Sequence, residues 1–170
     1  MDFEELRRPN SISEDSIEYI LNVIKKNKLK KVLEIGCLLG YSALRFSTVA
    51  ESVKTIEISK TNSQKAMENF KKFDAKNIEL LEGDARDILK KVDEKFDFIF
   101  IDAMKKQYKE YLILALNLID KGFIYADNTI SHKEDMKDFF EYLKESKLNW
   151  KELGLGRGLV EMKLQITASC

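Results

Sequence analysis

The stretch KKVLEIGCLLGYS (residues 30–42) combines a short apolar run, a glycine turn and the start of a helix. Val32, Leu33 and Ile35 are typical of a strand buried in a sheet. Gly36 and Gly40 permit the tight turn and the close backbone approach that a nucleotide-like ligand requires. Glycines at such places are equally common as plain turn formers. This stretch therefore predicts a strand–turn–helix unit and leaves its ligand open.

The same alternation continues along the chain. A first helix carries Ile17, Ile20, Leu21 and Ile24 on one face, with Ser11 or Ser13 as its cap. Further strands are predicted at VKTIEI (53–58), NIELLEGD (77–84), FDFIFID (96–102), GFIYADN (122–128), NWKELGLG (149–156) and GLVEMKLQI (158–166). Helices are predicted at YSALRFSTVA (41–50), SQKAMENFKKF (63–73), ARDILKKV (85–92), YKEYLILALNLI (108–119) and HKEDMKDFFEYLKES (132–146).

This order predicts an α/β fold with a mostly parallel sheet and helices on both faces. The closing hairpin, turning at Arg157-Gly158, makes the last strand antiparallel to its neighbour. Three local features refine the prediction. Ser131 and Glu134 form a capping box, Lys121-Gly122 ends the preceding helix, and Met67, Phe70 and Phe73 point inward.

Composition indicates one soluble globular domain over residues 1–170, with 44% hydrophobic and 34% charged residues. No apolar run approaches the roughly 18 residues of a membrane span, and MDFEELRRPN (1–10) lacks the order of a signal peptide, which predicts a cytoplasmic location. The two cysteines, Cys37 and Cys170, form no metal pattern, and no disulfide framework is predicted. A formal net charge of zero gives no global case for nucleic acid.

Acidic residues stand at the carboxyl ends of successive predicted strands, where open α/β sheets bind their ligands. Glu57 follows Gly36 by roughly 20 residues, the offset at which an acid takes ribose hydroxyls. Asp84, Asp102 and Asp127 end the next strands. Each could be a solvated strand end by itself. Their recurrence along one edge predicts a binding site, although the G-x-x-x-G spacing disfavours a nicotinamide dehydrogenase.

Together these residues resemble the class I S-adenosylmethionine-dependent methyltransferases, which have a Rossmann-like seven-stranded sheet. VLEIGCLLGYSALRF (32–46), TIEIS (55–59), FDFIFIDAMKKQY (96–108) and ADNT (126–129) are similar, in order and spacing, to the metal-dependent catechol and caffeoyl-CoA O-methyltransferases. The resemblance runs from about Ile12 to the end of the chain. Its most specific part is Asp102-x-x-Lys105 followed by Asp127-Asn128.

The resemblance implies a set of catalytic and metal-binding residues. Asp102, Asp127 and Asn128 would hold one divalent ion, expected to be Mg²⁺, as hard oxygen ligands. Lys105 would be the general base that takes a proton from a metal-bound hydroxyl, with Asp102 beside it. In the plainer interpretation, Asp127 caps a turn and Asn128 bonds locally. Lys106 is the nearest rival base.

The resemblance also implies a cofactor site. Ser42 and the backbone around Gly36 would meet the methionine carboxylate, Glu57 the ribose, and Asp84 and Ala85 the adenine, with Met104 packing on its face or serving only as helix packing. The backbone of Ile12 would contribute as well. The full predicted set comprises Glu34, Gly36, Gly40, Ser42, Glu57, Ile58, Asp84, Ala85, Asp102 and Met104. His132, Cys37 and Trp150 are expected to be structural: exposed, a small filler and core, respectively.

The chain departs from the family pattern in three places. The glycine turn has Leu38 and Leu39 where relatives often have small or aromatic residues. The chain begins about ten residues before the matched region, so the additional N-terminal helices of relatives are expected to be missing. LGLGRGLVEMK (153–163) has glycine and leucine where the catechol enzyme has an acidic residue that orients the substrate, which disfavours catechol itself. Residues 1–11 could form an arm exchanged in a homodimer, since family members are often dimers.

The leading hypothesis is O-methylation of a small catechol-like aromatic, with a homodimer and no membrane partner. A second is methylation of a hydroxyuridine in transfer RNA, and a third is a non-catalytic S-adenosylmethionine-binding protein. A basic rim would favour RNA or an acyl-CoA. Its members would be Arg7, Arg8, Lys105, Lys106, Lys109 and Arg157, and a lysine-rich solvated surface is the simpler alternative.

Overall fold

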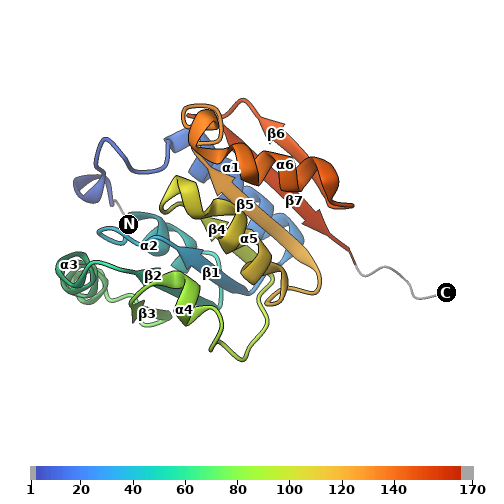
Figure 1. Cartoon of the computed structure of the whole chain (residues 1–170). Coiled ribbons are helices and arrows are strands. Elements are labelled where there is room, and N and C mark those ends of the chain that lie inside the picture. Colours follow the sequence, from blue (N-terminus) through green and yellow to red (C-terminus); the bar gives the residue numbers. More distant parts are fainter. Residues whose placement is uncertain (1–2, 166–170) are drawn as a thin grey trace.

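The computed structural model describes residues 3–165 and contains a seven-stranded sheet with the strand order β3-β2-β1-β4-β5-β7-β6 (Figure 1). The strands are β1 (Lys31–Ile35), β2 (Ser52–Glu57), β3 (Ile78–Glu82), β4 (Phe98–Ile101), β5 (Gly122–Asp127), β6 (Asn149–Leu153) and β7 (Leu159–Leu164). The first five are parallel, and β7 runs antiparallel to both β5 and β6. This confirms the predicted Rossmann-like fold, including the antiparallel last strand.

The strand order reverses between β1 and β4. From β1 the chain first moves outward to β2 and β3, and then returns to the other side of β1 with β4 and β5. In open α/β sheets, the crevice beyond the carboxyl ends of the strands at such a reversal is where ligands bind. The fold therefore places the ends of β1 and β4, with Gly36 and Asp102 just beyond them, at the centre of this edge.

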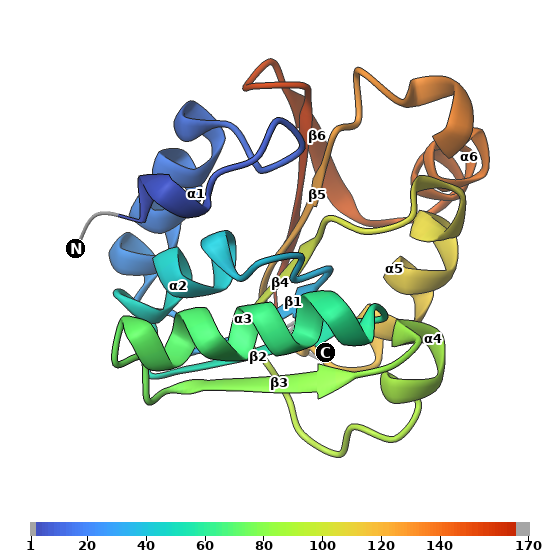
Figure 2. The ribbon, with the colours of Figure 1, turned by 90° about the vertical axis from the view of Figure 1, so that its left-hand side faces the viewer.

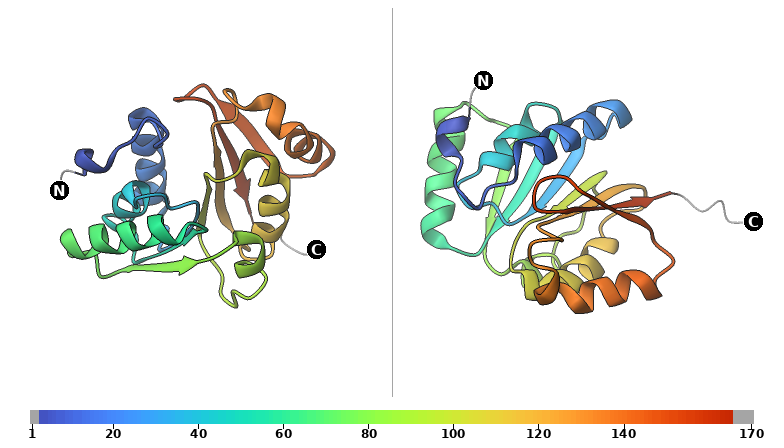
Figure 3. Two further views of the ribbon diagram at one scale, coloured as in Figure 1. Left: turned by 60° about the vertical axis from the view of Figure 1, so that its left-hand side comes forward. Right: turned by 90° about the horizontal axis from the view of Figure 1, so that it is seen from above.

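Helices cover both faces of the sheet, as the alternating sequence pattern predicts (Figures 2 and 3). One face packs against α1 (Glu14–Asn27), α2 (Tyr41–Ser47) and α3 (Lys60–Lys72), and the other against α4 (Ala85–Ile88), α5 (Tyr108–Leu116) and α6 (Lys137–Glu145). Strand β4 contributes to the hydrophobic core on both faces of the sheet. Phe98 and Phe100 pack on the side of α1–α3, and Ile99 and Ile101 on the side of α4–α6. Short 3₁₀ helices complete the set: η1 (Glu4–Leu6), η2 (Lys105–Gln107) and η3 (Lys133–Met136).

Several local predictions are confirmed. Ser13 caps α1, since its Oγ accepts the Ser16 N–H at 3.4 Å. Trp150 packs edge-on against Phe140, beside the core. Cys37 is a buried free thiol. Within residues 3–165, no helix is both long enough and apolar enough to cross a membrane. The predicted last strand included Ile166, which lies outside the described residues, as does Cys170.

Three local predictions are wrong. The capping box does not form: Ser131 Oγ donates to the Asn128 carbonyl at 3.3 Å, and η3 separates it from α6. Helix α5 already ends at Leu116, and Gly122 opens β5 instead, at φ 128°. A Cβ there would lie 1.9 Å from the Asp97 carbonyl oxygen, so glycine is required by strand packing. Met67 is 51% exposed, because α3 covers an edge of the sheet.

Candidate active site

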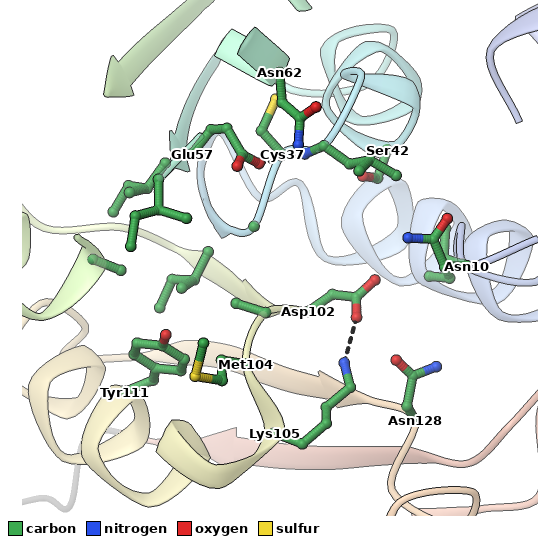
Figure 4. Close-up of a pocket in the computed structure, with 18 of the residues that line it drawn as sticks. Asn10, Cys37, Ser42, Glu57, Asn62, Asp102, Met104, Lys105, Tyr111 and Asn128 are labelled. Atoms are coloured by element: carbon green, nitrogen blue, oxygen red, sulfur yellow. Dashed lines mark hydrogen bonds and ion pairs between the residues drawn. The ribbon is translucent and has the colours of Figure 1, made fainter. Parts of the chain in front are cut away.

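A cavity of about 590 Å³ opens at the carboxyl ends of the parallel strands. Its walls come from the turn after β1, from the residues that follow β2 to β5, from the N-terminal segment 3–12 and from the β6–β7 turn. Figure 4 shows Asp102 near the middle, with Met104 and Tyr111 on one side of it and Asn10 and Asn128 on the other. A single pocket thus gathers most of the predicted site residues.

The pocket has two ends. The glycine-turn end consists of Gly36, Ser42, Glu57, Ile58, Asp84, Ala85 and Met104, and the lysine end consists of Asn10, Ser11, Lys105, Asn128, His132 and Arg157. Asp102 lies between them. Ile12 also lines the pocket, as predicted. Glu34, Gly40 and Asp127 do not line it. The predicted roles of Glu34 and Gly40 at the cofactor and of Asp127 at a metal stay predictions.

The glycine-turn end is shaped by its backbone. Gly36 has φ 101°, and a Cβ there would lie 2.1 Å from the Asp102 carbonyl oxygen. Gly40 has φ 87°, and its Cβ would lie 2.4 Å from the Phe70 ring. Both glycines are therefore required by the turn and by close packing, whatever ligand the pocket holds. Glu57 secures the turn, since its two carboxylate oxygens accept the Leu38 N–H at 2.7 Å and the Ser59 N–H at 2.9 Å.

Exposed apolar side chains flank the same end. Ile58 and Met104 are 66% and 58% exposed, and both line the pocket. Large apolar side chains left uncovered at a cavity wall are what a flat apolar ligand would bury. Asp84 lies beside them, but it is already engaged: its carboxylate pairs with Arg86 at 2.6 Å and the pair holds the pKa of Asp84 below its usual range.

Beneath this end lies a completely buried carboxyl group. Glu34 on β1 accepts the Thr55 hydroxyl at 2.5 Å through Oε2, while Oε1 is buried and has no partner among the described residues. Burial raises the pKa of Glu34 to about 7, and the nearby charges of Asp102 and Glu57 act in the same direction. Glu34 is therefore readily protonated near neutral pH, unlike an ordinary carboxylate.

At the lysine end, Lys105 is fixed by two partners. Its Nζ lies 2.8 Å from Asp102 Oδ1 and 2.7 Å from the Tyr108 hydroxyl oxygen (Figure 4 shows the first contact). The fully buried Tyr108 hydroxyl in turn donates to the Asp127 carbonyl at 3.1 Å. These contacts connect the residues that follow β4 with the end of β5. Lys106 is exposed and does not line the pocket, so the geometry favours Lys105 as a reactive amine.

Asp127 and Asn128 are 2% and 4% exposed. Asn128 Nδ2 donates to Asp127 Oδ2 at 3.1 Å, and the backbone of Asn128 is left-handed at φ 65°, a conformation that asparagine tolerates well. The local hydrogen bond of the plainer interpretation is thus present. Burial, together with the charge of Asp102, raises the pKa of Asp127 to about 7.

The donor set fits a hard divalent cation. The mutual repulsion of Asp102 and Asp127 is what an ion between them would relieve, and Asn128 adds an amide oxygen. No group of three or more His, Cys, Asp or Glu residues that could hold an ion is found within residues 3–165. A metal would therefore depend on the two carboxylates and Asn128, with water or ligand oxygens completing its coordination.

The pocket mouth is partly formed by the N-terminal segment. Phe3 and Leu6 are buried against the chain's own helices, and Leu6, Asn10 and Ser11 line the pocket. Arg157 in the β6–β7 turn donates to the carbonyls of Pro9 and Ser11 at 3.1 and 3.0 Å. The described part of the predicted arm therefore folds onto its own chain.

The predicted basic rim is only partly at the pocket. Of its six members, Lys105 and Arg157 line the cavity. Arg7 pairs with Glu4 and Glu14, and Arg8 donates to the carbonyls of Glu5 and Arg7.

Sequence reasoning missed three features of this site. His132, expected to be exposed, is half-buried and lines the pocket. Tyr108 supports Lys105, and its spacing of three residues from Lys105 was the only available signal. Arg157 was assigned to a rim, and nothing in the sequence linked it to Pro9 and Ser11.

Comparison with known proteins gives a consistent result. The sequence profile of a family described as O-methyltransferase matches residues 4–149. The chain is 37% identical over 112 residues to O-methyltransferase ankF from Aspergillus thermomutatus, covering 61% of this chain and 47% of that protein. It is 31% identical over 129 residues to a catechol O-methyltransferase from Niastella koreensis, covering 71% and 58%. The chain thus spans about half the length of these relatives.

The fold is also shared with solved structures. A methyltransferase from Podospora anserina, determined with S-adenosylhomocysteine (SAH) bound, superposes with a TM-score of 0.86 at 24% sequence identity. The match covers 95% of this chain and 84% of that one. At this level of identity the likeness establishes a common fold.

Proposed function

Because the chain belongs to the O-methyltransferase family, we propose that it transfers a methyl group from S-adenosylmethionine to a hydroxyl group of a small, catechol-like aromatic acceptor. The observation that carries the proposal is the arrangement of Asp102, Lys105 and Tyr108 beside a pocket bounded by the glycine turn. An amine held at a fixed place next to a methyl-donor site is what proton removal from a hydroxyl requires.

The glycine-turn end is proposed to bind the cofactor. Gly36 and Ser42 would receive its methionine part, and Glu57 its ribose. Ile58 and Met104 offer apolar surface of the kind that covers an adenine ring. The bound cofactor supplies an electrophilic methyl group on a sulfonium sulfur. The protein's own task is to align that methyl with the acceptor oxygen and to exclude water.

The lysine end is proposed to activate the acceptor. Lys105 Nζ, in its neutral form, would accept the hydroxyl proton as the O–H bond breaks. The oxygen electron pair then forms the new O–CH₃ bond while the S–CH₃ bond breaks, leaving a neutral thioether. Asp102 and Tyr108 would keep Nζ at the acceptor oxygen and stabilise the ammonium group that results. No covalent enzyme intermediate is involved.

Asp102, Asp127 and Asn128 would hold a divalent ion, proposed to be Mg²⁺. When bound, such an ion lowers the pKa of a coordinated hydroxyl and orients it. Support comes from the repulsion between Asp102 and the buried Asp127. A cation that neutralised Asp102 and Asp127 would also release Lys105 from its ion pair with Asp102.

A small acceptor is favoured over RNA by the pocket mouth. The segment 3–12 and the β6–β7 turn narrow the opening, and Arg7 and Lys105 are already paired with carboxylates. A cavity of about 590 Å³ is of a size typical for small-molecule sites.

The test is methyl transfer from labelled S-adenosylmethionine to a panel of catechols and, separately, to unmodified transfer RNA. Each reaction is run with Mg²⁺ and with a chelator. We expect labelled catechols with Mg²⁺ and loss of most activity with chelator. Labelling of RNA alone would show that the acceptor is RNA rather than a small aromatic. Activity undiminished by chelator would show that the reaction needs no divalent metal. Binding of S-adenosylmethionine without methyl transfer to any acceptor would indicate a non-catalytic S-adenosylmethionine-binding protein.

A further inference from the structure

The lysine end contains an arginine that forms no ion pair among residues 3–165. Its charge acts at longer range on the buried Asp127, whose pKa it lowers. Arg157 lines the pocket, and no carboxylate oxygen of residues 3–165 lies within 4.0 Å of its guanidinium nitrogens. Two of its N–H groups donate to the carbonyls of Pro9 and Ser11. An arginine side chain has five N–H donors, so the remainder of this fork is available to a ligand in the pocket.

The position of Arg157 is fixed by its own backbone. Its carbonyl accepts the N–H groups of Ile130 and Ser131, each at 3.0 Å, which ties the β6–β7 turn to the loop that follows β5. The neighbouring Gly156 N–H donates to Asp15 Oδ2 at 3.0 Å. The backbone of Arg157 is thus held by the loop that follows β5 and its guanidinium by the N-terminal segment, so little conformational freedom would be lost on binding a ligand.

The charges of the two pocket ends differ. At the glycine-turn end, the acidic residues Glu57 and Asp84 line the pocket. At the lysine end, Asn10, Asn128 and His132 are polar, and Lys105 is balanced by Asp102. Arg86 also reaches the pocket wall, but it pairs with Asp84. Among the pocket-lining Lys and Arg side chains of residues 3–165, Arg157 is therefore the one without an ion pair, and Asp127 is affected by its charge only from beyond 4.0 Å.

We propose that Arg157 determines acceptor specificity by binding an anionic substituent, either a carboxylate or a phosphate group, on the hydroxylated aromatic. The planar guanidinium fork matches both oxyanions and discriminates against neutral isosteres. This inference rests on the proposed function, since it names the chemical class of acceptor for the same site. An acceptor whose hydroxyl lies at Lys105 would direct its oxyanion toward the β6–β7 turn.

The test compares two acceptors of nearly the same shape, one anionic and one neutral. Kinetics are measured with 3,4-dihydroxybenzoate and with its neutral isostere 3,4-dihydroxybenzamide, for the wild-type protein and for Arg157→Gln. We expect kcat/KM for the benzoate to fall roughly 10- to 100-fold in the variant, and that for the benzamide to change less than about threefold. Arg157→Lys should retain part of the benzoate preference. A 3,4-dihydroxybenzylphosphonate arm distinguishes a phosphate-type preference from a carboxylate one.

Arg8→Gln is the matched control, because Arg8 also donates to carbonyls of the N-terminal segment but does not line the pocket. It should leave the benzoate preference intact. Equal losses for both acceptors in Arg157→Gln would mean that Arg157 acts only by holding that segment, and the inference would fall.

Binding of the same two acceptors is measured by calorimetry in the presence of SAH, independently of turnover. A benzoate preference that Arg157→Gln abolishes would uphold the inference even if no acceptor were methylated, in which case only the proposed function fails. Equal affinity of the wild-type protein for both acceptors would overturn it.

Discussion

The glycine-turn end and the lysine end of the pocket are built in different ways. At the glycine-turn end, the backbone itself forms the wall, with Gly36 packed against the Asp102 carbonyl and Glu57 bonded to the turn. At the lysine end, the wall consists of side chains held by hydrogen bonds, such as Lys105 on Asp102 and Tyr108 and Arg157 on Pro9 and Ser11. The first end depends on backbone conformation and close backbone packing, and the second on side-chain contacts.

This difference has a functional meaning. A wall made of backbone is rigid and insensitive to side-chain variation, which suits a ligand common to many relatives. A wall of side chains from several segments can change one residue at a time, which suits a variable acceptor. Substitutions should therefore separate the two ends, with losses of binding at the first and losses of turnover or selectivity at the second.

The largest effect is expected from Lys105→Ala, which removes the proposed base at the lysine end. We expect kcat to fall by about 10²- to 10⁴-fold, the usual contribution of general acid–base catalysis. The affinity for SAH should stay within about threefold, because the glycine-turn end is untouched. Single-turnover methyl transfer and calorimetry measure the two quantities.

Lys106→Ala is the control for this substitution, since Lys106 carries the same charge one residue away but is exposed and outside the pocket. It should leave both quantities near wild type. Near-normal turnover of Lys105→Ala at every pH would exclude Lys105 as the base.

Gly36→Ala is expected to have the next largest effect, this time at the glycine-turn end. The added Cβ would meet the Asp102 carbonyl oxygen at 2.1 Å in a backbone conformation that alanine avoids, so the turn must shift. We expect a loss of about 2–4 kcal/mol in the free energy of unfolding and at least tenfold weaker SAH binding. Denaturant titration and calorimetry are the measurements.

Gly154→Ala provides a matched control, because a Cβ at Gly154 meets nothing within 4 Å. Its unfolding free energy should change by less than about 0.5 kcal/mol. If Gly36→Ala changed the unfolding free energy and SAH binding as little as Gly154→Ala, the backbone conformation at Gly36 would not determine the shape of the glycine-turn end.

Much of the fold could be predicted because its determinants are local. The apolar runs of β1 and β4 and the alternation of strands with helices require no knowledge of distant contacts. The errors occurred where distant contacts decide. Gly122 is required by its proximity to Asp97, rather than by a helix end. The backbone N–H of Ser131 donates to the distant Arg157 carbonyl, and its hydroxyl donates to the Asn128 carbonyl instead of capping α6.

The site residues likewise differ in how well the sequence predicts them. Strand-end residues such as Glu57 and Asp102 could be identified from the sequence because each follows an apolar run. Both line the pocket. Tyr108 and Arg157 were missed or misassigned because their partners, Asp127 and Pro9, are far along the chain. Glu34 lies in the sheet behind the pocket wall, bonded to Thr55, and its predicted role at the cofactor stays a prediction.

Glu34 yields a pH prediction for the glycine-turn end. Its pKa is raised from 4.5 to about 7, so between these values it is protonated when folded and ionised when unfolded. The free energy of unfolding should therefore decrease as pH rises through this window and level off above pH 7. Glu34→Gln removes this dependence, while Asp127 contributes equally to both proteins.

The unfolding free energy of Glu34→Gln relative to wild type should hence rise by about 2–3 kcal/mol between pH 4.5 and pH 7.5. Urea titrations at several pH values measure it, and the difference is independent of any constant cost of the buried amide. A difference that does not vary with pH would show that Glu34 has an ordinary pKa.

The smallest effect is expected from Tyr108→Phe, which tests whether the lysine end depends on its supporting contacts. The substitution removes the hydroxyl joining Lys105 Nζ at 2.7 Å to the Asp127 carbonyl at 3.1 Å, while the buried ring remains. We expect about a tenfold lower kcat and a loss of about 1 kcal/mol in the free energy of unfolding. Tyr142→Phe, on the helix that covers the same face, should change neither. If kcat kept its wild-type value while stability fell, Asp102 alone would suffice to position Lys105.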